Sequence, residues 1–315
     1  MSRRRNLQDA TVVVTGASSG VGRGTAMALA ARGARVVLAA RRADALEHLA
    51  RELRARGGRA LVVPTDVSDA AAVAALARQA LEWHGGIDVW INNAAVTAVG
   101  RFWDVPLSDH HRVVEVTLGG ALNGSHAALT AFIGQGHGTL VNVGSLEAAV
   151  PLAYHSSYAA SKAGLETLTR VLHQEVRLTA HADRIHLASV LPWALDTPLW
   201  RHVANRLGRT PRMAAMEDPA RAVAAVLRAC TRPRLTRPVG VKATLGALSA
   251  RALPRLTDHL AASLSEVERR RGHRRPLTAG SLHTPRADEP DMRGDMRAVM
   301  RAEDHTPSLT TEELP

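Results

Sequence analysis

Short runs of β-branched residues alternate with longer runs rich in alanine and leucine along most of this chain. We expect strands at residues 11–15, 35–39, 60–64, 87–92, 139–143 and 184–191, and helices at 21–32, 43–56, 69–84, 108–133 and 158–179. Strands that alternate with helices pair in parallel through right-handed crossovers. The expected strands show no apolar–polar alternation, which is typical of a sheet covered on both faces. The sequence therefore predicts an α/β fold built on a doubly wound parallel sheet.

The regular pattern loosens after Pro192, and the composition changes toward the C-terminus. From about Ser265 onward the chain is polar and rich in Arg, Asp, Glu and Pro. Such a segment buries too little apolar surface to order itself. We therefore expect a single domain over residues 1–264 and a mostly disordered polar tail over residues 265–315.

A row of leucines at roughly helical spacing precedes that tail. Its members are Leu245, Leu248, Leu253, Leu256, Leu260 and Leu264. Two interpretations stay open. The row packs against the main domain or a neighbouring subunit, or it lies on an anionic membrane and admits lipophilic substrates.

The chain of 315 residues carries a formal net charge of +11, which can indicate a nucleic-acid or membrane partner. Its basic residues are nearly all arginines without a basic block, so we interpret the charge as a composition bias and expect no nucleic-acid partner. Cys230 is the only cysteine, which fits a reducing compartment. No apolar run suits a signal peptide or the roughly 20 residues of a membrane span. We therefore expect a cytoplasmic protein.

A glycine-rich turn joins the first expected strand to the first expected helix. The expected phosphate-binding residues in it are Gly16, Ser18, Ser19, Gly20, Val21 and Gly22. Gly16 allows a tight turn, Gly20 lets the backbone approach a pyrophosphate, and Gly22 lets the helix pack close to the sheet. The helix N-terminus adds free N–H groups and the positive end of its dipole. This context predicts a Rossmann-like dinucleotide site.

The end of the second expected strand bears on which dinucleotide is bound. An NAD site places an acid near this point to bind the ribose 2′-hydroxyl. Here Ala40 is followed by Arg41 and Arg42. A guanidinium suits a 2′-phosphate, so the sequence favours NADP(H) with Arg41 at that phosphate. The alternative is that both arginines are merely solvated in an arginine-rich chain.

Tyr158 and Lys162 stand four residues apart, and therefore on one face of an expected helix. The chain has only two tyrosines and two lysines, so a Tyr–Lys pair at this spacing is not expected by chance. We expect the ammonium to lower the pKa of the phenol from its ordinary value of about 10, against the opposing effect of desolvation. A tyrosine tuned in this way can act as a general acid or base. The alternative is a surface tyrosine beside a solvated lysine.

Ser145 follows the expected strand at 139–143, at the edge where ligands bind in open α/β sheets. Its hydroxyl could bind a substrate oxygen or merely cap a loop.

Together these residues resemble the short-chain dehydrogenase/reductase family over about residues 9–242. The turn is similar to the family's T-G-x-x-x-G-x-G motif, and Ser145, Tyr158 and Lys162 match its catalytic serine and Y-x-x-x-K. The resemblance implies further cofactor contacts at Asp66, Val67, Asn93, Ala94, Tyr158, Lys162, Pro192, Leu195 and Thr197.

Three positions depart from the family pattern. Ala95 stands where the family has glycine in N-N-A-G, and Trp193 replaces the glycine after Pro192. Thr117 falls where an asparagine usually completes a proton relay through water, so it is included among the catalytic residues in place of that asparagine. Trp193 and Trp200 fall where relatives build the substrate pocket, and an apolar substrate is expected.

The resemblance implies hydride transfer between NADP(H) and a small-molecule carbonyl or alcohol, without a metal. Ser145 polarises the substrate oxygen, Tyr158 moves the proton, and Lys162 tunes Tyr158 and holds the ribose. The resemblance also implies a homodimer or homotetramer that pairs through the helices at 108–133 and 158–179. The departures at Thr117 and Trp193 leave one alternative, a weakly active or inactive regulatory protein that binds NADP(H).

Overall fold

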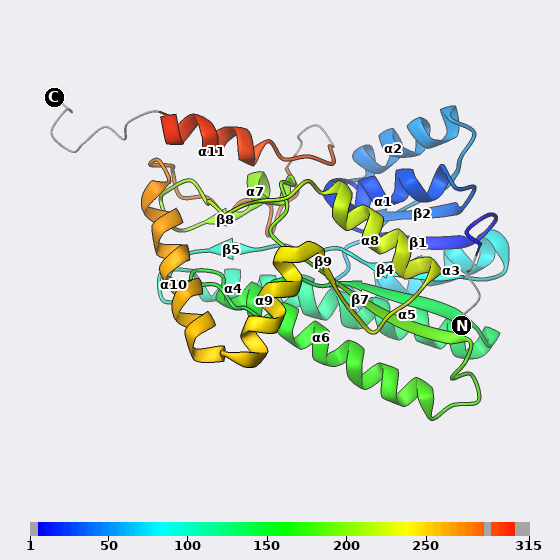
Figure 1. Ribbon diagram of the computed structural model, residues 1–315. Coiled ribbons are helices and arrows are strands. Elements are labelled where there is room, and N and C mark those ends of the chain that lie inside the picture. The colour runs from blue at the N-terminus through cyan, green and yellow to red at the C-terminus, as the bar shows by residue number, and fades with distance from the viewer. Residues whose placement is uncertain (1–5, 287–290, 306–315) are drawn as a thin grey trace, which may run out of the picture.

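The computed structural model describes residues 6–286 and 291–305, and its centre is a seven-stranded parallel sheet (Figure 1). The strand order is β3-β2-β1-β4-β6-β7-β9. The strands are β1 (Thr11–Thr15), β2 (Arg35–Ala40), β3 (Arg59–Pro64), β4 (Val89–Asn92), β6 (Gly138–Val143), β7 (Ile185–Pro192) and β9 (Thr236–Val239). The order reverses between β1 and β4, which is where a doubly wound sheet opens a ligand crevice. The predicted Rossmann-like fold class is confirmed.

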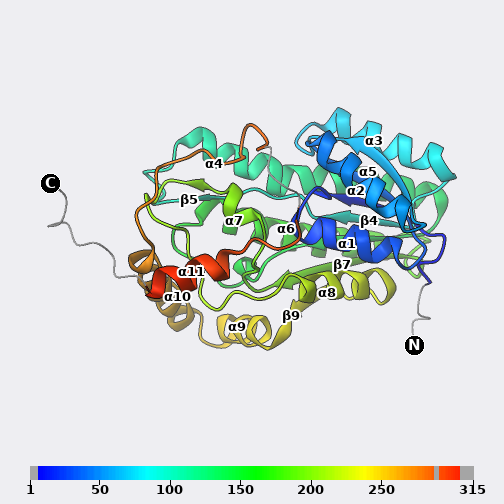
Figure 2. The ribbon, with the colours of Figure 1, turned by 90° about the horizontal axis from the view of Figure 1, so that it is seen from above.

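Helices cover both faces of this sheet, which explains why its strands are apolar on both sides (Figure 2). One face carries α1 (Gly20–Ala30), α2 (Ala43–Ala55) and α8 (Ala220–Thr231). The other carries α3 (Ala70–His84), α5 (Gly120–Gln135) and α6 (Ser156–Arg177). Val12 and Val14 of β1 point into the first layer and Val13 into the second, all three fully buried. The core is thus divided into two apolar layers by the sheet.

The long helix expected at residues 108–133 is interrupted. It consists of α4 (Leu107–Val114), a π-helical turn η1 (Glu115–Gly119) and α5. Single π-helical turns within α-helices are often found at functional sites. This turn contains Thr117, whose contacts are described below.

Shorter elements stand above the carboxyl ends of the strands. They are β5 (Ala98–Val99), which pairs with β8 (Ala204–Asn205), the 3-10 turn η2 (Leu146–Ala148) and α7 (Leu199–His202). They surround the crevice at the strand ends, where ligands of open α/β sheets bind.

The described residues of the expected disordered tail, 265–286 and 291–305, are folded, and residues 287–290 and 306–315 lie outside the described part of the chain. The C-terminal part of the chain forms α9 (Gly240–Ala252), α10 (Pro254–Arg271) and α11 (Met296–His305), so the expected boundary at residue 264 falls inside α10. A buried guanidinium holds these elements: Arg212 pairs with Glu268 of α10 and with Glu303 and Asp304 of α11. Composition alone cannot reveal such specific pairs. That residues 1–264 form a folding unit of their own stays a prediction.

The leucine row lies on α9 and α10, and all six of its side chains are exposed. The row as a whole therefore does not pack against the main domain of the same chain, although Leu264 lines a cavity together with Leu146. A neighbouring subunit or a membrane surface stays open as its partner. Within the described residues, no helix combines the length and the apolar character needed to cross a membrane.

Candidate active site

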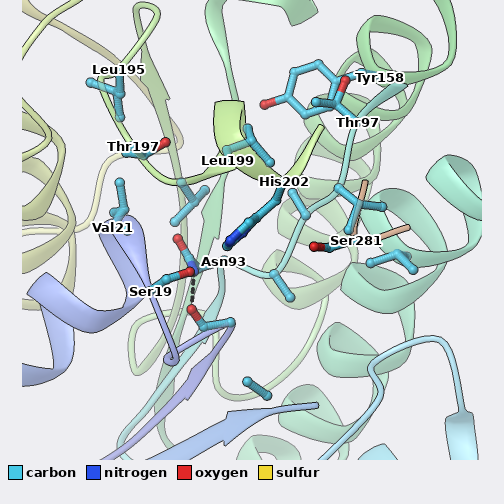
Figure 3. Close-up of a pocket in the computed structure, with 18 of the residues that line it drawn as sticks. Ser19, Val21, Asn93, Thr97, Tyr158, Leu195, Thr197, Leu199, His202 and Ser281 are labelled. Atoms are coloured by element: carbon cyan, nitrogen blue, oxygen red, sulfur yellow. Dashed lines mark hydrogen bonds between the residues drawn. The ribbon is translucent and has the colours of Figure 1, made fainter. Parts of the chain in front are cut away.

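A cavity of about 240 Å³ lies at the carboxyl ends of β1, β2, β4, β6 and β7. Figure 3 shows residues from distant parts of the sequence around this space: Val21 and Thr197 on one side, Tyr158, His202 and Ser281 toward the other. The predicted site residues that line it are Gly16, Ser18, Ser19, Gly20, Val21, Arg41, Asp66, Val67, Asn93, Ala94, Ser145, Tyr158, Lys162, Pro192, Trp193, Leu195, Thr197 and Trp200. Gly22 and Thr117 do not line it, but each contacts a residue that does: Gly22 packs against Gly16, and Thr117 hydrogen-bonds Val96.

The turn after β1 has the backbone that its glycines predict. Gly16 has φ of +65°, where a side chain is strained, and a Cβ at this position would also stand 2.8 Å from the Cα of Ala94. A Cβ at Gly22 would collide with the carbonyl oxygen of Gly16. The Thr15 hydroxyl accepts hydrogen bonds from the backbone N–H groups of Asn93 and Ala94, at 3.0 and 3.2 Å. The turn is thus held tightly against the segment after β4.

Arg41 follows β2 and lines the cavity, as predicted, but its terminal nitrogens are already engaged. Nη2 donates to the carbonyl oxygen of Ser281 at 2.6 Å, and Nη1 donates to those of Leu282 and His283 at 3.1 and 3.2 Å. Arg42 Nη2 lies 3.4 Å from the hydroxyl of Ser18. The basic pair after β2 therefore touches both the C-terminal segment and the glycine-rich turn.

Asp66, the expected adenine-side acid, is held in place by two neighbours. It accepts hydrogen bonds from the Ser68 hydroxyl at 2.7 Å and from Arg112 Nη2 at 2.6 Å. These bonds keep the pKa of Asp66 below its ordinary value, against the effect of burial. The carboxylate stays charged, and its geometry is fixed from the far side of the cavity.

Tyr158 and Lys162 lie on one face of α6, and both reach the cavity. Lys162 Nζ lies 5.5 Å from the centroid of the Tyr158 ring and donates to the carbonyl oxygen of Val143 at 2.8 Å. Burial lowers the pKa of Lys162 to about 8, although the charge of Glu147 opposes this shift. Burial raises the pKa of Tyr158 above its ordinary value, Glu147 raises it further, and a hydrogen bond with Ser145 opposes the rise.

The expected lowering of the pKa of Tyr158 by Lys162 is therefore wrong. The ammonium lies 5.5 Å from the centroid of the ring, and desolvation outweighs its attraction. Tyr158 is thus a protonated phenol, and Lys162 is a readily titrated amine.

Ser145 combines both of the roles considered from the sequence. Its hydroxyl caps η2 by accepting from the backbone N–H of Glu147 at 3.2 Å. The same side chain lines the cavity and hydrogen-bonds Tyr158. The capping bond fixes where the hydroxyl lies beside the phenol.

A buried pair in the cavity wall was missed by the sequence reasoning. Glu147 presents both carboxylate oxygens to His155 Nδ1, each at 3.2 Å, and both residues line the cavity. The two residues lie eight positions apart without a motif to link them. The signal that was available is the acid two positions after Ser145.

Thr117 binds the backbone of the segment after β4. Its hydroxyl accepts from the backbone N–H of Val96 at 3.2 Å and donates to the carbonyl oxygen of Val96 at 3.0 Å. Both backbone groups of a cavity-lining residue are thereby satisfied by one side chain from η1. Thr117 acts on the site through Val96 rather than by facing the cavity.

The two tryptophans near β7 shape the wall above the catalytic end. Trp193 Nε1 donates to the carbonyl oxygen of Ala214 at 3.1 Å, and Trp200 Nε1 donates to that of Leu195 at 2.9 Å. Trp193 also lines a second cavity of about 70 Å³, which shares Ser145 and Glu147 with the first. Its other walls are mainly apolar, with Leu146, Val150, Leu152, Leu207, Met213 and Leu264. Trp193, Ala194, Ser145 and Glu147 thus line both cavities.

Several further residues of the cavity wall were also missed. They are Thr97, His202, Ser281 and Arg286. None belongs to a motif, and the last two come from a segment expected to be disordered. No group of three or more His, Cys, Asp or Glu side chains among the described residues could hold a metal ion.

Comparison with known proteins accords with this geometry. The family profile described as short chain dehydrogenase matches residues 10–207. The uncharacterized oxidoreductase YxnA of Bacillus subtilis is 36% identical over 259 residues, which are 81% of this chain and 72% of YxnA. The cis-4-hydroxycyclohexanecarboxylate dehydrogenase of Sinomonas cyclohexanicum is 40% identical over 67% of this chain and 86% of its own.

Among solved structures, the fold is similar to that of a short chain dehydrogenase/reductase from Burkholderia phymatum in complex with NAD. The TM-score is 0.70 at 24% sequence identity, over 82% of this chain and 98% of the other. At this identity the likeness concerns the fold alone. The profile match and the relatives carry the assignment: this chain belongs to the short-chain dehydrogenase/reductase family of oxidoreductases.

Proposed function

We propose that this protein is an NADP(H)-dependent enzyme that interconverts a carbonyl group and an alcohol. The observation that carries the proposal is the meeting of Ser145, Tyr158 and Lys162 in the cavity that the glycine-rich turn also lines. A general acid, a donor to the substrate oxygen and a phosphate-binding turn therefore share one space.

The cavity wall fits a dinucleotide. The turn packs so tightly at Gly16 and Gly22 that a Cβ there would collide with protein atoms. It places Gly20 and Val21, at the start of α1, in the cavity wall, where the N-terminus of a helix favours a phosphate. At the other end, the hydroxyl of Ser281 is buried, without a hydrogen-bond partner among the described residues. Buried polar groups in native proteins are normally paired, so this hydroxyl supports a polar ligand.

A bound nicotinamide supplies the hydride in reduction and accepts it in oxidation. In reduction, Ser145 donates a hydrogen bond to the carbonyl oxygen, and Tyr158 gives that oxygen its proton, which yields the alcohol. The raised pKa of Tyr158 keeps the hydroxyl protonated until negative charge develops on the substrate. As negative charge then develops on the phenol oxygen, it attracts the Lys162 ammonium, which lies 5.5 Å from the centroid of the ring. In oxidation the phenolate takes the proton back.

The preference for NADP(H) is supported by charge at the end of β2. Ala40 stands where a repelling carboxylate would be, and Arg41 and Arg42 both line the cavity. A fluorescence titration with NADPH and, separately, NADH tests this part. We expect tighter binding of NADPH, whereas equal or tighter binding of NADH would contradict the preference and leave the oxidoreductase proposal standing.

An apolar alcohol or ketone is the substrate that the second cavity favours, because its wall is mainly aliphatic beside Arg212, Glu268 and Arg269, and Ser145 lines both cavities. The name of the Sinomonas relative gives an alicyclic alcohol that also carries a carboxylate, so it supports an alcohol substrate and not its apolar character. A homodimer or homotetramer and a cytoplasmic location stay predictions.

The regulatory alternative makes a distinct prediction. A regulator binds NADP(H) but shows no difference between the wild type and Tyr158→Phe in any assay of turnover. The contacts of Thr117 hold the cavity wall at Val96, which both alternatives require, so the turnover assay decides between them.

A further inference from the structure

A segment from the C-terminal part of the chain forms one wall of the main cavity. Residues 278–286, here called the C-terminal wall, contribute Ser281, Pro285 and Arg286 to the cavity lining. Figure 3 shows Ser281 at the edge of this space, facing His202. The nearest motif residues in the sequence lie some eighty positions earlier, at Pro192 to Thr197, so that only the fold brings this segment to the site.

The C-terminal wall is anchored in the fold at both its start and its middle. Thr278 exchanges two backbone hydrogen bonds with Asn205 of β8, at 2.8 and 3.0 Å. The side chain of Leu282 is 1% exposed and packs in an apolar cluster with Ala98 and Val113. Tyr158 packs against the same cluster. The wall is therefore part of the site rather than a segment resting on its surface.

Two arginines at the adenosine end of the site hold the C-terminal wall through its backbone. Arg41 donates to the carbonyl oxygens of Ser281, Leu282 and His283. Arg112 Nε donates to the carbonyl oxygen of Leu282 at 3.2 Å while its Nη2 binds Asp66. Both terminal nitrogens of Arg41 donate hydrogen bonds to these carbonyl oxygens, so Arg41 fixes the position of the C-terminal wall.

The fixed wall presents one polar group that lacks a partner. Ser281 is 7% exposed, and its hydroxyl oxygen is buried without a hydrogen-bond partner among the described residues. Its backbone carbonyl is tied to Arg41, which holds the residue beside the end of β2. In this fold the end of β2 faces the adenosine ribose of a dinucleotide.

We propose that the C-terminal wall is part of the cofactor site, in which the Ser281 hydroxyl hydrogen-bonds the adenosine ribose or its 2′-phosphate and Arg41 positions the wall. The inference rests on the proposed function, because it takes the ligand to be a nicotinamide dinucleotide. It changes the role of Arg41 from a direct phosphate ligand to a positioning residue.

The first test is a fluorescence titration of the full chain with NADPH and with NADH, in the wild type, Ser281→Ala and Thr284→Ala. Thr284 is the matched control, because it lies on the same wall, is exposed and does not line the cavity. Loss of one neutral hydrogen bond weakens binding about 2- to 10-fold. We therefore expect the Kd for NADPH to rise about 2- to 10-fold with Ser281→Ala and to stay unchanged with Thr284→Ala.

The NADH arm identifies the atom that is bound: a similar weakening assigns an oxygen common to both cofactors, and an effect on NADPH alone assigns the 2′-phosphate. An unchanged or lower Kd for NADPH with Ser281→Ala would overturn the inference. If the wild type itself binds neither cofactor, the proposed function fails. If the wild type binds and Ser281→Ala binds equally well, only the present inference fails.

The second test concerns Arg41. With Arg41→Gln we expect faster hydrogen–deuterium exchange in the peptide that covers residues 278–286, together with weaker binding of the same cofactors that Ser281→Ala weakens. In the Ser281→Ala background the same substitution should weaken binding less, because the two residues act through one contact. A loss of NADPH binding alone, with exchange in that peptide unchanged, would show that Arg41 binds the phosphate directly and would overturn its positioning role.

Discussion

Lys162 shows how one buried side chain can tune the chemistry of the site. The residue is 3% exposed, its ammonium donates to Val143, and burial lowers its pKa to about 8. An amine with this pKa holds or releases its proton near neutral pH, which a solvated lysine does not. The charge that Lys162 lends to Tyr158 therefore depends on pH.

This shift predicts a pH-dependent free energy of unfolding. The pKa is about 8 in the folded chain and 10.5 for an ordinary lysine, so between these values the unfolded chain binds the extra proton. Stability rises with pH wherever the unfolded state binds more protons. The cost of burying the ammonium is thus complete below about pH 8 and shrinks toward pH 10.5.

Urea unfolding of the wild type and of Lys162→Met over this range measures the effect. We expect the free energy of unfolding of the wild type to rise relative to that of the variant as the pH increases from 8 to 10.5. Parallel profiles for the two proteins would show that Lys162 keeps an ordinary pKa in the folded chain.

At the scale of elements, the π-helical turn η1 joins the helix α4–α5 to the cavity wall. Thr117 is 1% exposed, and its hydroxyl is bound to both backbone groups of Val96. Thr117→Val should lower the free energy of unfolding by about 1–3 kcal/mol, because the backbone groups of Val96 are left unpaired. Thr117→Ser keeps the hydroxyl and serves as the control. Urea unfolding compares the two, and an equal loss in both variants would assign the effect to packing.

The attachment of α10 and α11 depends on one buried cation. The Arg212 side chain is 1% exposed and pairs with Glu268, Glu303 and Asp304. Arg212→Met removes the buried cation that these carboxylates share, and Glu268 and Glu303 keep only the more distant and exposed Arg271 and Arg275, at 3.6 and 3.9 Å. We therefore expect a loss of about 3–5 kcal/mol in the free energy of unfolding. Arg221→Met is the control, since Arg221 is exposed in its pair with Glu217, and it should change stability by less than about 1 kcal/mol. Similar losses in both variants, measured by urea unfolding, would contradict this role of Arg212.

At the scale of the whole molecule, the sequence predicted those parts of the fold that depend on local patterns. The alternation of strands and helices gave the sheet, and the glycine spacing gave the turn, because each depends on neighbouring residues. The catalytic-end residues Ser145, Tyr158 and Lys162 were found in the same way. Their placement in one cavity agrees with the prediction, while their roles stay to be tested.

What the sequence could not predict arises from contacts between distant segments. Arg41 meets Ser281 across 240 positions, and Arg212 meets Glu303 across 91. No local pattern marks such partners, and the polar composition of the C-terminal part suggested disorder instead. The direction of the pKa shift of Tyr158 was missed for a related reason, because burial is a property of the assembled site.

Assembly is the last prediction at this scale. Apolar side chains such as Leu122 of α5 and Val171 of α6 are exposed, on the two helices expected to pair with a second copy. Light scattering after size-exclusion chromatography should give the mass of a dimer or tetramer for the wild type and a lower mass for Leu122→Glu. Leu178→Glu, at an exposed position beyond the end of α6, should leave the mass unchanged. A monomeric wild type would contradict the predicted pairing.

The most direct test of the account is turnover with NADPH and a panel of apolar ketones, in the wild type and in Tyr158→Phe. Consumption of NADPH is followed by its absorbance, and binding of NADPH is checked in both proteins by fluorescence. We predict turnover by the wild type and a loss of about 10²- to 10⁴-fold with Tyr158→Phe when NADPH saturates both proteins, since the variant lacks the general acid. Equal rates in the two proteins would contradict the role of Tyr158, and with it the proposed mechanism.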